Sequence, residues 1–180
     1  RDLVRSRGLG DVYKRQEELE KYMAELKSAW SESVAEIKTG NPVTDVILTQ
    51  KQKEAEEKGI DFRCKFMYPT DTGINAFDVS VILNNAITNA FEGVNGCKNP
   101  YVSVSAYRKK NAYMLELTNC VCKSVEIDDE TGVPETTKKD KGSHGFGLAN
   151  IRKVAQKYYG DIDISQDENS FTLTVMLMVE

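Results

Sequence analysis

The amino-acid sequence predicts an α+β fold, a two-layer sandwich in which helices cover one face of a mixed sheet, preceded by an N-terminal helix. In some segments apolar residues recur every three or four positions, and in others they recur at every second position, which is typical of helices and strands respectively. Along the chain these segments run helix, strand, helix, strand, strand, long polar segment, helix, strand, strand. That order fits one two-layer domain.

The composition limits the class of protein. A chain of 180 residues with 40% hydrophobic and 29% charged residues is long enough for one well-packed globular domain. No apolar run approaches the roughly eighteen residues of a membrane span, so we expect a cytoplasmic chain without membrane contact of its own. The net charge of −4 argues against a nucleic-acid partner. The four cysteines lack zinc-knuckle spacing and are expected to be reduced.

The N-terminal part is expected to be separate from the fold. Residues 6–16 resemble the translation of a transposase-type sequencing adapter, and we therefore exclude residues 1–16 from structural reasoning as an artefact. Residues 17–37 carry apolar side chains at helical spacing and predict an amphipathic helix. The Gly40-Asn41-Pro42 sequence ends this helix, because glycine favours helix C-termini and the residue before proline avoids the α region.

The remaining helices and strands are predicted from the spacing of apolar residues and from glycine and proline residues that mark the ends of elements. Gly59 and Gly160 are interpreted as stops after helices. Residues 120–143 are polar and too long for a simple connection inside a compact domain, and loops of this kind are usually lids or disordered. The predicted helices are 43–58, 76–93 and 148–159, and the predicted strands are 60–67, 101–107, 112–118, 161–165 and 170–178.

Two asparagines stand out on the most apolar helix, residues 76–93. Asn85 and Asn89 are four residues apart and therefore share one face of the helix. Carboxamides among apolar side chains are costly to bury without partners, and the simplest interpretation is that they bond neighbouring backbone. The functional alternative is an amide oxygen that helps to bind Mg²⁺, which prefers oxygen ligands and takes few from protein when phosphates supply the rest.

A glycine-rich segment, residues 142–148, closes the polar stretch and opens the next helix. Gly145 and Gly147 would let the backbone approach a phosphate, and the helix start offers unpaired N–H groups. The alternative is a simple hinge before a helix. The segment contains neither a P-loop lysine motif nor the dinucleotide-binding glycine pattern.

The order of these features is more specific than any one of them. Asn-x-x-x-Asn-Ala on a helix, a hairpin, a polar lid, Gly-x-Gly-Leu at a helix start and two final strands resemble the GHKL ATPase superfamily. Residues 38–42, 45–48, 136–141 and 144–148, together with Lys51, are similar to the quorum-sensing and peptide-sensing subgroup of sensor histidine kinases. The resemblance covers about residues 38–178 and implies the Bergerat ATP-binding fold, with ATP and Mg²⁺ as cofactors.

The resemblance also implies roles for individual residues. Asn89 would be the Mg²⁺ ligand, and Asn85 would be catalytic by positioning water or phosphate. The phosphate loop would comprise residues 144–148, namely His144, Gly145, Phe146, Gly147 and Leu148.

Three further residues complete the implied nucleotide site. Asn119 stands where the family commonly has an aspartate that accepts a hydrogen bond from the adenine amino group. The amide oxygen of Asn119 can accept the same hydrogen bond, but it lacks the negative charge that would strengthen it. Thr172 falls where the family keeps a threonine near adenine. Lys139, in a run of lysines, would neutralise the triphosphate when the lid closes, although a solvated charge run is the alternative.

The resemblance implies the ATP-binding catalytic domain of a two-component sensor kinase, which transfers the γ-phosphoryl group of ATP to a histidine. His144 is the only histidine and lies in the phosphate loop, so the acceptor is expected on an upstream segment that this chain lacks. Residues 17–37 would be a remnant of the dimerisation segment. We expect a dimer partner, a response regulator and a membrane-anchored parent protein. The alternatives are a catalytically decayed ATP-binding module, a serine kinase of the anti-sigma-factor type, and an α+β domain that does not bind nucleotide.

Overall fold

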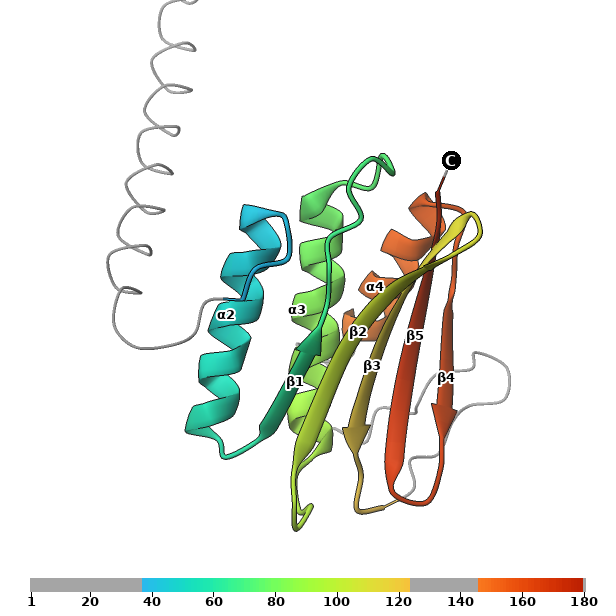
Figure 1. The fold of residues 1–180 in the computed structure, drawn as a ribbon. Coiled ribbons are helices and arrows are strands. Elements are labelled where there is room, and N and C mark those ends of the chain that lie inside the picture. Colours follow the sequence, from blue (N-terminus) through green and yellow to red (C-terminus); the bar gives the residue numbers. More distant parts are fainter. Residues whose placement is uncertain (1–36, 124–145, 180) are drawn as a thin grey trace, which may run out of the picture. The chain divides into compact units, whose positions relative to one another are not determined.

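A computed structural model describes residues 37–123 and 146–179, which belong to one compact α+β unit (Figure 1). The predicted N-terminal segments, 1–16 and 17–37, lie outside the described residues apart from Ile37. The described helices are α2 (Pro42–Glu57), α3 (Ala76–Gly93) and α4 (Phe146–Lys157). The strands are β1 (Asp61–Lys65), β2 (Tyr101–Lys109), β3 (Ala112–Cys120), β4 (Ile162–Gln166) and β5 (Ser170–Met178).

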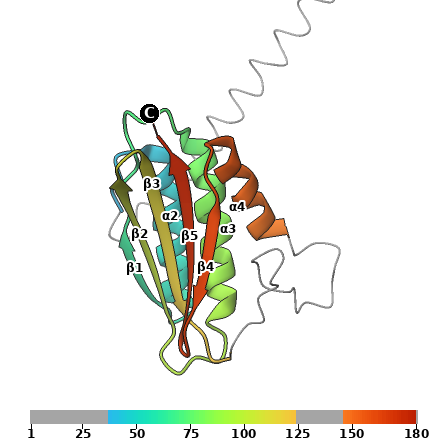
Figure 2. The ribbon, with the colours of Figure 1, turned by 90° about the vertical axis from the view of Figure 1, so that its right-hand side faces the viewer.

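The five strands form one mixed sheet in the order β1-β2-β3-β5-β4. Strand β1 pairs parallel to β2, and the other neighbours pair antiparallel. The view turned by 90° shows the helices on one side of this sheet (Figure 2). The predicted fold class is therefore confirmed, and the element order is the predicted one.

Local sequence signals explain where the helices begin. Asn41 caps α2 by accepting a hydrogen bond from the Val43 N–H at 2.9 Å, and Pro42 occupies the first turn, where a missing N–H costs nothing. Asn75 caps α3 in the same way. None of the helices in the two described ranges has the length and apolar character that crossing a bilayer would require.

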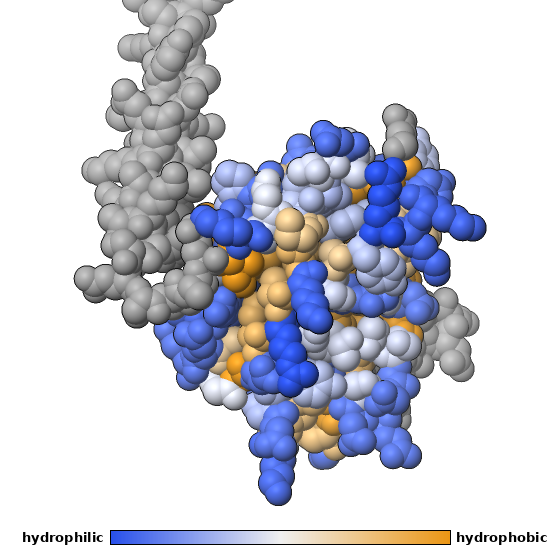
Figure 3. Space-filling model, in the orientation of Figure 1, coloured by the Kyte–Doolittle hydropathy of each residue, from blue (hydrophilic) through white to orange (hydrophobic). Residues whose placement is uncertain are grey.

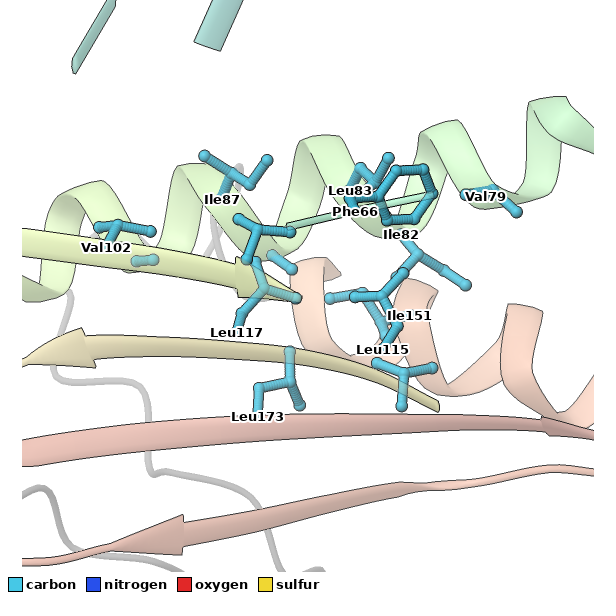
Figure 4. Packing of buried hydrophobic residues seen from close by; sticks show 14 of the residues in the cluster. Phe66, Val79, Ile82, Leu83, Ile87, Val102, Leu115, Leu117, Ile151 and Leu173 are labelled. Carbon is cyan, nitrogen blue, oxygen red and sulfur yellow. The ribbon is translucent and has the colours of Figure 1, made fainter. Parts of the chain in front are cut away.

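The hydrophobic core lies between the sheet and the helices. Alternate residues of β3 and β5 point towards the helices, so that Leu115, Leu117, Val175 and Leu177 are almost completely buried. Figure 4 shows this packing between α3, α4 and the strands, with Phe66, Val79, Ile82, Leu83, Ile87, Val102, Leu115, Leu117, Ile151 and Leu173 labelled.

The opposite surface of the sheet is mixed in character. Met114, Glu116 and Thr118 alternate with the buried residues of β3 and are half-buried. On the molecular face seen in Figure 3, hydrophobic patches are interrupted by hydrophilic side chains. The helices α2, α3 and α4, by contrast, line the covered side, and the chemistry-bearing asparagines are on that side.

Candidate nucleotide site

Helix α3 carries the two asparagines that the sequence singles out. Its apolar side chains, including Ile82, Leu83 and Ile87, pack into the core, while Asn85 and Asn89 lie half-buried at the edge of this face. The spacing of four residues places them one turn apart, as predicted. Helix packing therefore holds both carboxamides on one stripe of α3.

The two amides differ in their hydrogen bonds. The Nδ2 of Asn85 donates to the Val81 carbonyl one turn earlier at 2.8 Å, which leaves the Asn85 oxygen as the available acceptor. Within residues 37–123 and 146–179, no hydrogen bond to the Asn89 side chain is recorded. Asn85 thus makes the backbone bond that the simplest interpretation expects, whereas Asn89 offers an uncommitted carboxamide.

The start of α4 lies directly against Asn89. A Cβ atom placed on Gly147 would be 3.1 Å from Nδ2 and 3.2 Å from Oδ1 of Asn89, closer than ordinary van der Waals contact. Residue 147 is in the first turn of α4, where backbone N–H groups lack helical partners and the helix dipole is positive. The structure therefore joins the asparagine helix to the glycine-rich helix start, two features that are far apart in the sequence.

Other residues of the predicted phosphate loop are described only in part. Leu148 is half-buried and packs against the hydrophobic core, which fixes the first turn of α4. His144, Gly145 and Lys139 lie outside the described residues, and for Phe146 only the backbone is described.

Asn119 lies against the C-terminal end of α3, one helical turn beyond Asn89. It occupies the helix-facing side of β3, is 4% exposed, and donates from Nδ2 to the Cys120 carbonyl at 2.9 Å. A Cβ atom on Gly93, at the end of α3, would be only 2.8 Å from this Nδ2. The amide nitrogen of Asn119 is thus committed to the protein, and its oxygen is the atom left to accept from a ligand.

Gly93 was predicted from the sequence only as the last residue of a helix. Its place against Asn119 could have been suspected, because residues 85, 89 and 93 are each four apart and form one stripe along the helix. In the structure, that stripe connects Gly147 at one point with Asn119 at the other.

The structure does not bring Thr172 to these residues. Its hydroxyl lies 3.0 Å from the hydroxyl of Thr118, its register partner on β3. Asn119 is in register with Phe171. Because successive strand residues point to opposite faces, Thr118 and Thr172 are on the surface of the sheet away from the helices.

Cys97, Cys120 and Cys122 lie close to one another near the C-terminal end of α3. Burial, the neighbouring Cys120 thiol and the charges that Cys120 and Cys122 would carry raise the pKa of Cys97 to about 12. Cys97 is therefore a neutral thiol at physiological pH and brings no negative charge near this end of α3. All four cysteines are free, as predicted.

A cavity of about 500 Å³ opens near the C-terminal ends of α2 and α3. Thr88 and Phe91 of α3 contribute to its lining, and they lie on a different stripe of the helix from that of residues 85, 89 and 93. Lys51 of α2 donates to Thr88 at 3.0 Å and to Glu54 at 2.9 Å in this region, which ties α2 to α3. The cavity is thus separate from the asparagine stripe.

The asparagine side chains of this site offer neutral oxygens as metal ligands. Across the described ranges, no group of three or more His, Cys, Asp or Glu side chains is placed to hold a metal ion. A divalent cation at Asn89 would need its charge balanced by a ligand such as a triphosphate, and the Asn89 oxygen, which accepts no hydrogen bond from the described residues, fits such a role.

The chain matches the sequence profile of a known protein family. The sequence profile of the GHKL domain matches residues 74–178, more than half of the chain and all of the elements from α3 to β5. No relative was found among curated proteins.

Solved structures share the fold. The catalytic domain of histidine kinase ThkA superposes with a TM-score of 0.62 at 18% identity, covering 79% of this chain and 93% of that one. Histidine kinase AdeS of Acinetobacter baumannii gives 0.58 at 14% identity, covering 94% and 80%. A histidine kinase from Burkholderia phymatum gives 0.56 at 14% identity, covering 93% and 80%. At these identities the likeness concerns the fold.

Proposed function

Because this chain belongs to the GHKL domain family, which implies ATP binding, we propose that it is the catalytic domain of a sensor histidine kinase of the quorum-sensing or peptide-sensing type. In this proposal it transfers the γ-phosphoryl group of ATP to a histidine on a dimerisation segment. A dimer partner and a response regulator would be its protein partners, and residues 17–37 would derive from the dimerisation segment. The parent protein would be anchored in the membrane, with this domain in the cytoplasm.

The contact between Asn89 and Gly147 is the observation that supports the proposal most strongly. It joins an amide oxygen suited to Mg²⁺ with a helix start suited to phosphate, which are the two requirements for holding a metal-bound triphosphate. In this assignment Asn89 holds Mg²⁺, and Asn85 positions water or phosphate through its remaining oxygen. Residues 144–148 and Lys139 would surround the phosphates.

At the other end of the stripe, Asn119 would accept a hydrogen bond from the adenine amino group. Its Nδ2 is occupied by the Cys120 carbonyl, so the side chain is oriented before a ligand arrives. The distance along α3 from Asn89 to Gly93 is one turn, about 6 Å, so adenine and triphosphate would lie along one helix. Mg²⁺, when bound, would neutralise phosphate charge, and the protein would contribute mainly by positioning the reactants.

The direct test is a calorimetric titration of the chain with ATP, with and without Mg²⁺. We expect ATP to bind and Mg²⁺ to strengthen the binding, because the Asn89 oxygen adds a ligand to the metal-bound nucleotide. GTP serves as a control, because guanine carries a carbonyl where adenine carries the amino group. No measurable binding of ATP in either condition would contradict the proposal and favour a decayed module.

Gly93→Ala tests the adenine end separately. The added methyl group would lie 2.8 Å from Asn119 Nδ2, so the Asn119 side chain would have to move. We expect about a fivefold loss of affinity for both ATP and adenosine, the value of roughly one hydrogen bond. Nuclear magnetic resonance titrations with the two ligands measure this, and unchanged adenosine affinity would argue against Asn119 as the adenine acceptor.

A further inference from the structure

Helices α3 and α4 touch at two polar points, one near each end. At one point Gly147 lies against Asn89. At the other, Lys157 and Tyr158 both reach the same carboxylate oxygen of Asp78, each at 2.5 Å. The first contact joins the start of α4 to the second half of α3, and the other joins the end of α4 to the first turn of α3. The two helices therefore run antiparallel.

The two contacts are equally spaced on both helices. Asp78 and Asn89 are eleven positions apart, and so are Gly147 and Tyr158, the residue that directly follows the last turn of α4. Eleven residues correspond to about three helical turns and about 16 Å, so both contacts fall on the same face of each helix. When Tyr158 is held at Asp78, α4 is therefore aligned along α3 so that Gly147 meets Asn89.

The Asp78 contact is well suited to hold that register. The Asp78 side chain is 15% exposed. The Tyr158 hydroxyl, besides donating to Asp78, accepts a hydrogen bond from the Asn75 N–H at the cap of α3 at 3.0 Å. Burial by itself would raise the pKa of Asp78, but the hydrogen bonds from Lys157 and Tyr158 and the charge of Lys157 outweigh it and lower the pKa. The carboxylate is therefore ionised at neutral pH.

We propose that Asp78 and Tyr158 are positioning residues for the phosphate end of the nucleotide site, because they set the register in which the start of α4 meets Asn89. This inference rests on the proposed function. A slip of one residue would move α4 by about 1.5 Å and turn it by about 100°, which would replace Gly147 beside Asn89 with a residue that bears a side chain. Misplacement by about 1 Å is enough to affect phosphoryl transfer strongly.

Tyr158→Phe tests the proposal, because it removes only the hydroxyl and keeps the aromatic ring. We expect the full chain carrying this change to bind Mg·ATP about tenfold more weakly, near the lower end of the effect of losing a hydrogen bond to a charged group. Adenosine, which has no phosphates, should bind as to the wild type. Nuclear magnetic resonance titrations with the two ligands give both affinities, and a merely structural defect would lower them together.

Tyr113→Phe is the matched control. It removes a hydroxyl that donates to the Met67 carbonyl at 2.6 Å, a contact that involves neither α3 nor α4. It should leave both affinities at wild-type values. Asp78→Asn keeps an acceptor for Tyr158 but loses the charge, so it should weaken Mg·ATP binding selectively and serves as the measurement if Tyr158→Phe does not fold.

The possible results are distinct. Selective weakening of Mg·ATP binding in the Tyr158 and Asp78 variants would support the positioning role. Mg·ATP affinity at the wild-type value, or equal weakening of Mg·ATP and adenosine, would overturn it. A wild-type chain that binds neither ligand would instead overturn the proposed function.

Discussion

Gly160→Ala should lower the midpoint of thermal unfolding by roughly 6–12 °C. A Cβ atom on Gly160 would lie 1.7 Å from the Met176 carbonyl oxygen and 2.7 Å from its carbon. The obstacle is the backbone of β5, held there by hydrogen bonds from Met176 N–H to Asp161 and from Met178 N–H to Tyr158, both 2.9 Å. Relief requires these bonds to stretch, at a cost of about 3 kcal/mol, near the upper end for overpacking.

Gly59→Ala is the control for this prediction. Helix α2 ends as α4 does, with the Ile60 N–H donating to Ala55 as the Gly160 N–H donates to Ala155. Gly59 has a φ of +66° and no atom within 4 Å of a built Cβ, so alanine there suffers only left-handed strain of about 1 kcal/mol. Thermal unfolding followed by circular dichroism compares the two, and equal midpoints for both variants would contradict the steric explanation.

The same helix end shows why the sequence-based interpretation was incomplete. Gly160 was interpreted as a stop for a helix ending at residue 159, but α4 ends at Lys157 and the left-handed residue is Tyr159, with a φ of 53°. Glycine is needed one position later, because β5 passes close to it. Local sequence cannot reveal that need, since the contacting strand lies about sixteen residues further along the chain.

The sequence predicted the structure correctly where residues close to one another in the chain determine it. Helix α3 has the predicted bounds because one strong apolar period continues from the Asn75 cap to the last turn at Gly93. The shared face of Asn85 and Asn89 follows from helix geometry alone. The hairpin strands β2 and β3 were predicted too short by two residues at their C-terminal ends, where Arg108, Lys109, Asn119 and Cys120 continue the pairing.

Thr172 shows why the sequence alone does not predict which face of the sheet a strand residue occupies. A strand alternates its faces with every residue, so the face that a side chain occupies depends on register with a partner far away in the sequence. Pairing of β5 with β3 puts Thr172 opposite Thr118 and Phe171 opposite Asn119. The position of a threonine in the family pattern does not determine which face of the sheet it occupies. Only the face of the sheet that is covered by the helices lies against the asparagine stripe of α3.

Asn89→Ala should remove most of the Mg²⁺-dependent affinity for ATP, a loss of about 10- to 100-fold, by analogy with the loss of groups that support a metal site. Calorimetric titration with ATP in excess Mg²⁺ measures it. With the metal chelated, the variant should bind ATP about as well as the wild type does, because Asn89 would act through the metal. This difference separates loss of a metal ligand from general damage to the site.

The control is Asn84→Ala, an exposed asparagine of the same helix that lies next to Asn85 in the sequence. Alanine has a higher helix propensity than asparagine by about 0.5 kcal/mol, so neither change should unfold α3. Asn84→Ala should bind Mg·ATP as the wild type does. If Asn89→Ala also binds Mg·ATP at wild-type affinity, Asn89 is not the metal ligand, and its contact with Gly147 would be a packing contact between two helices.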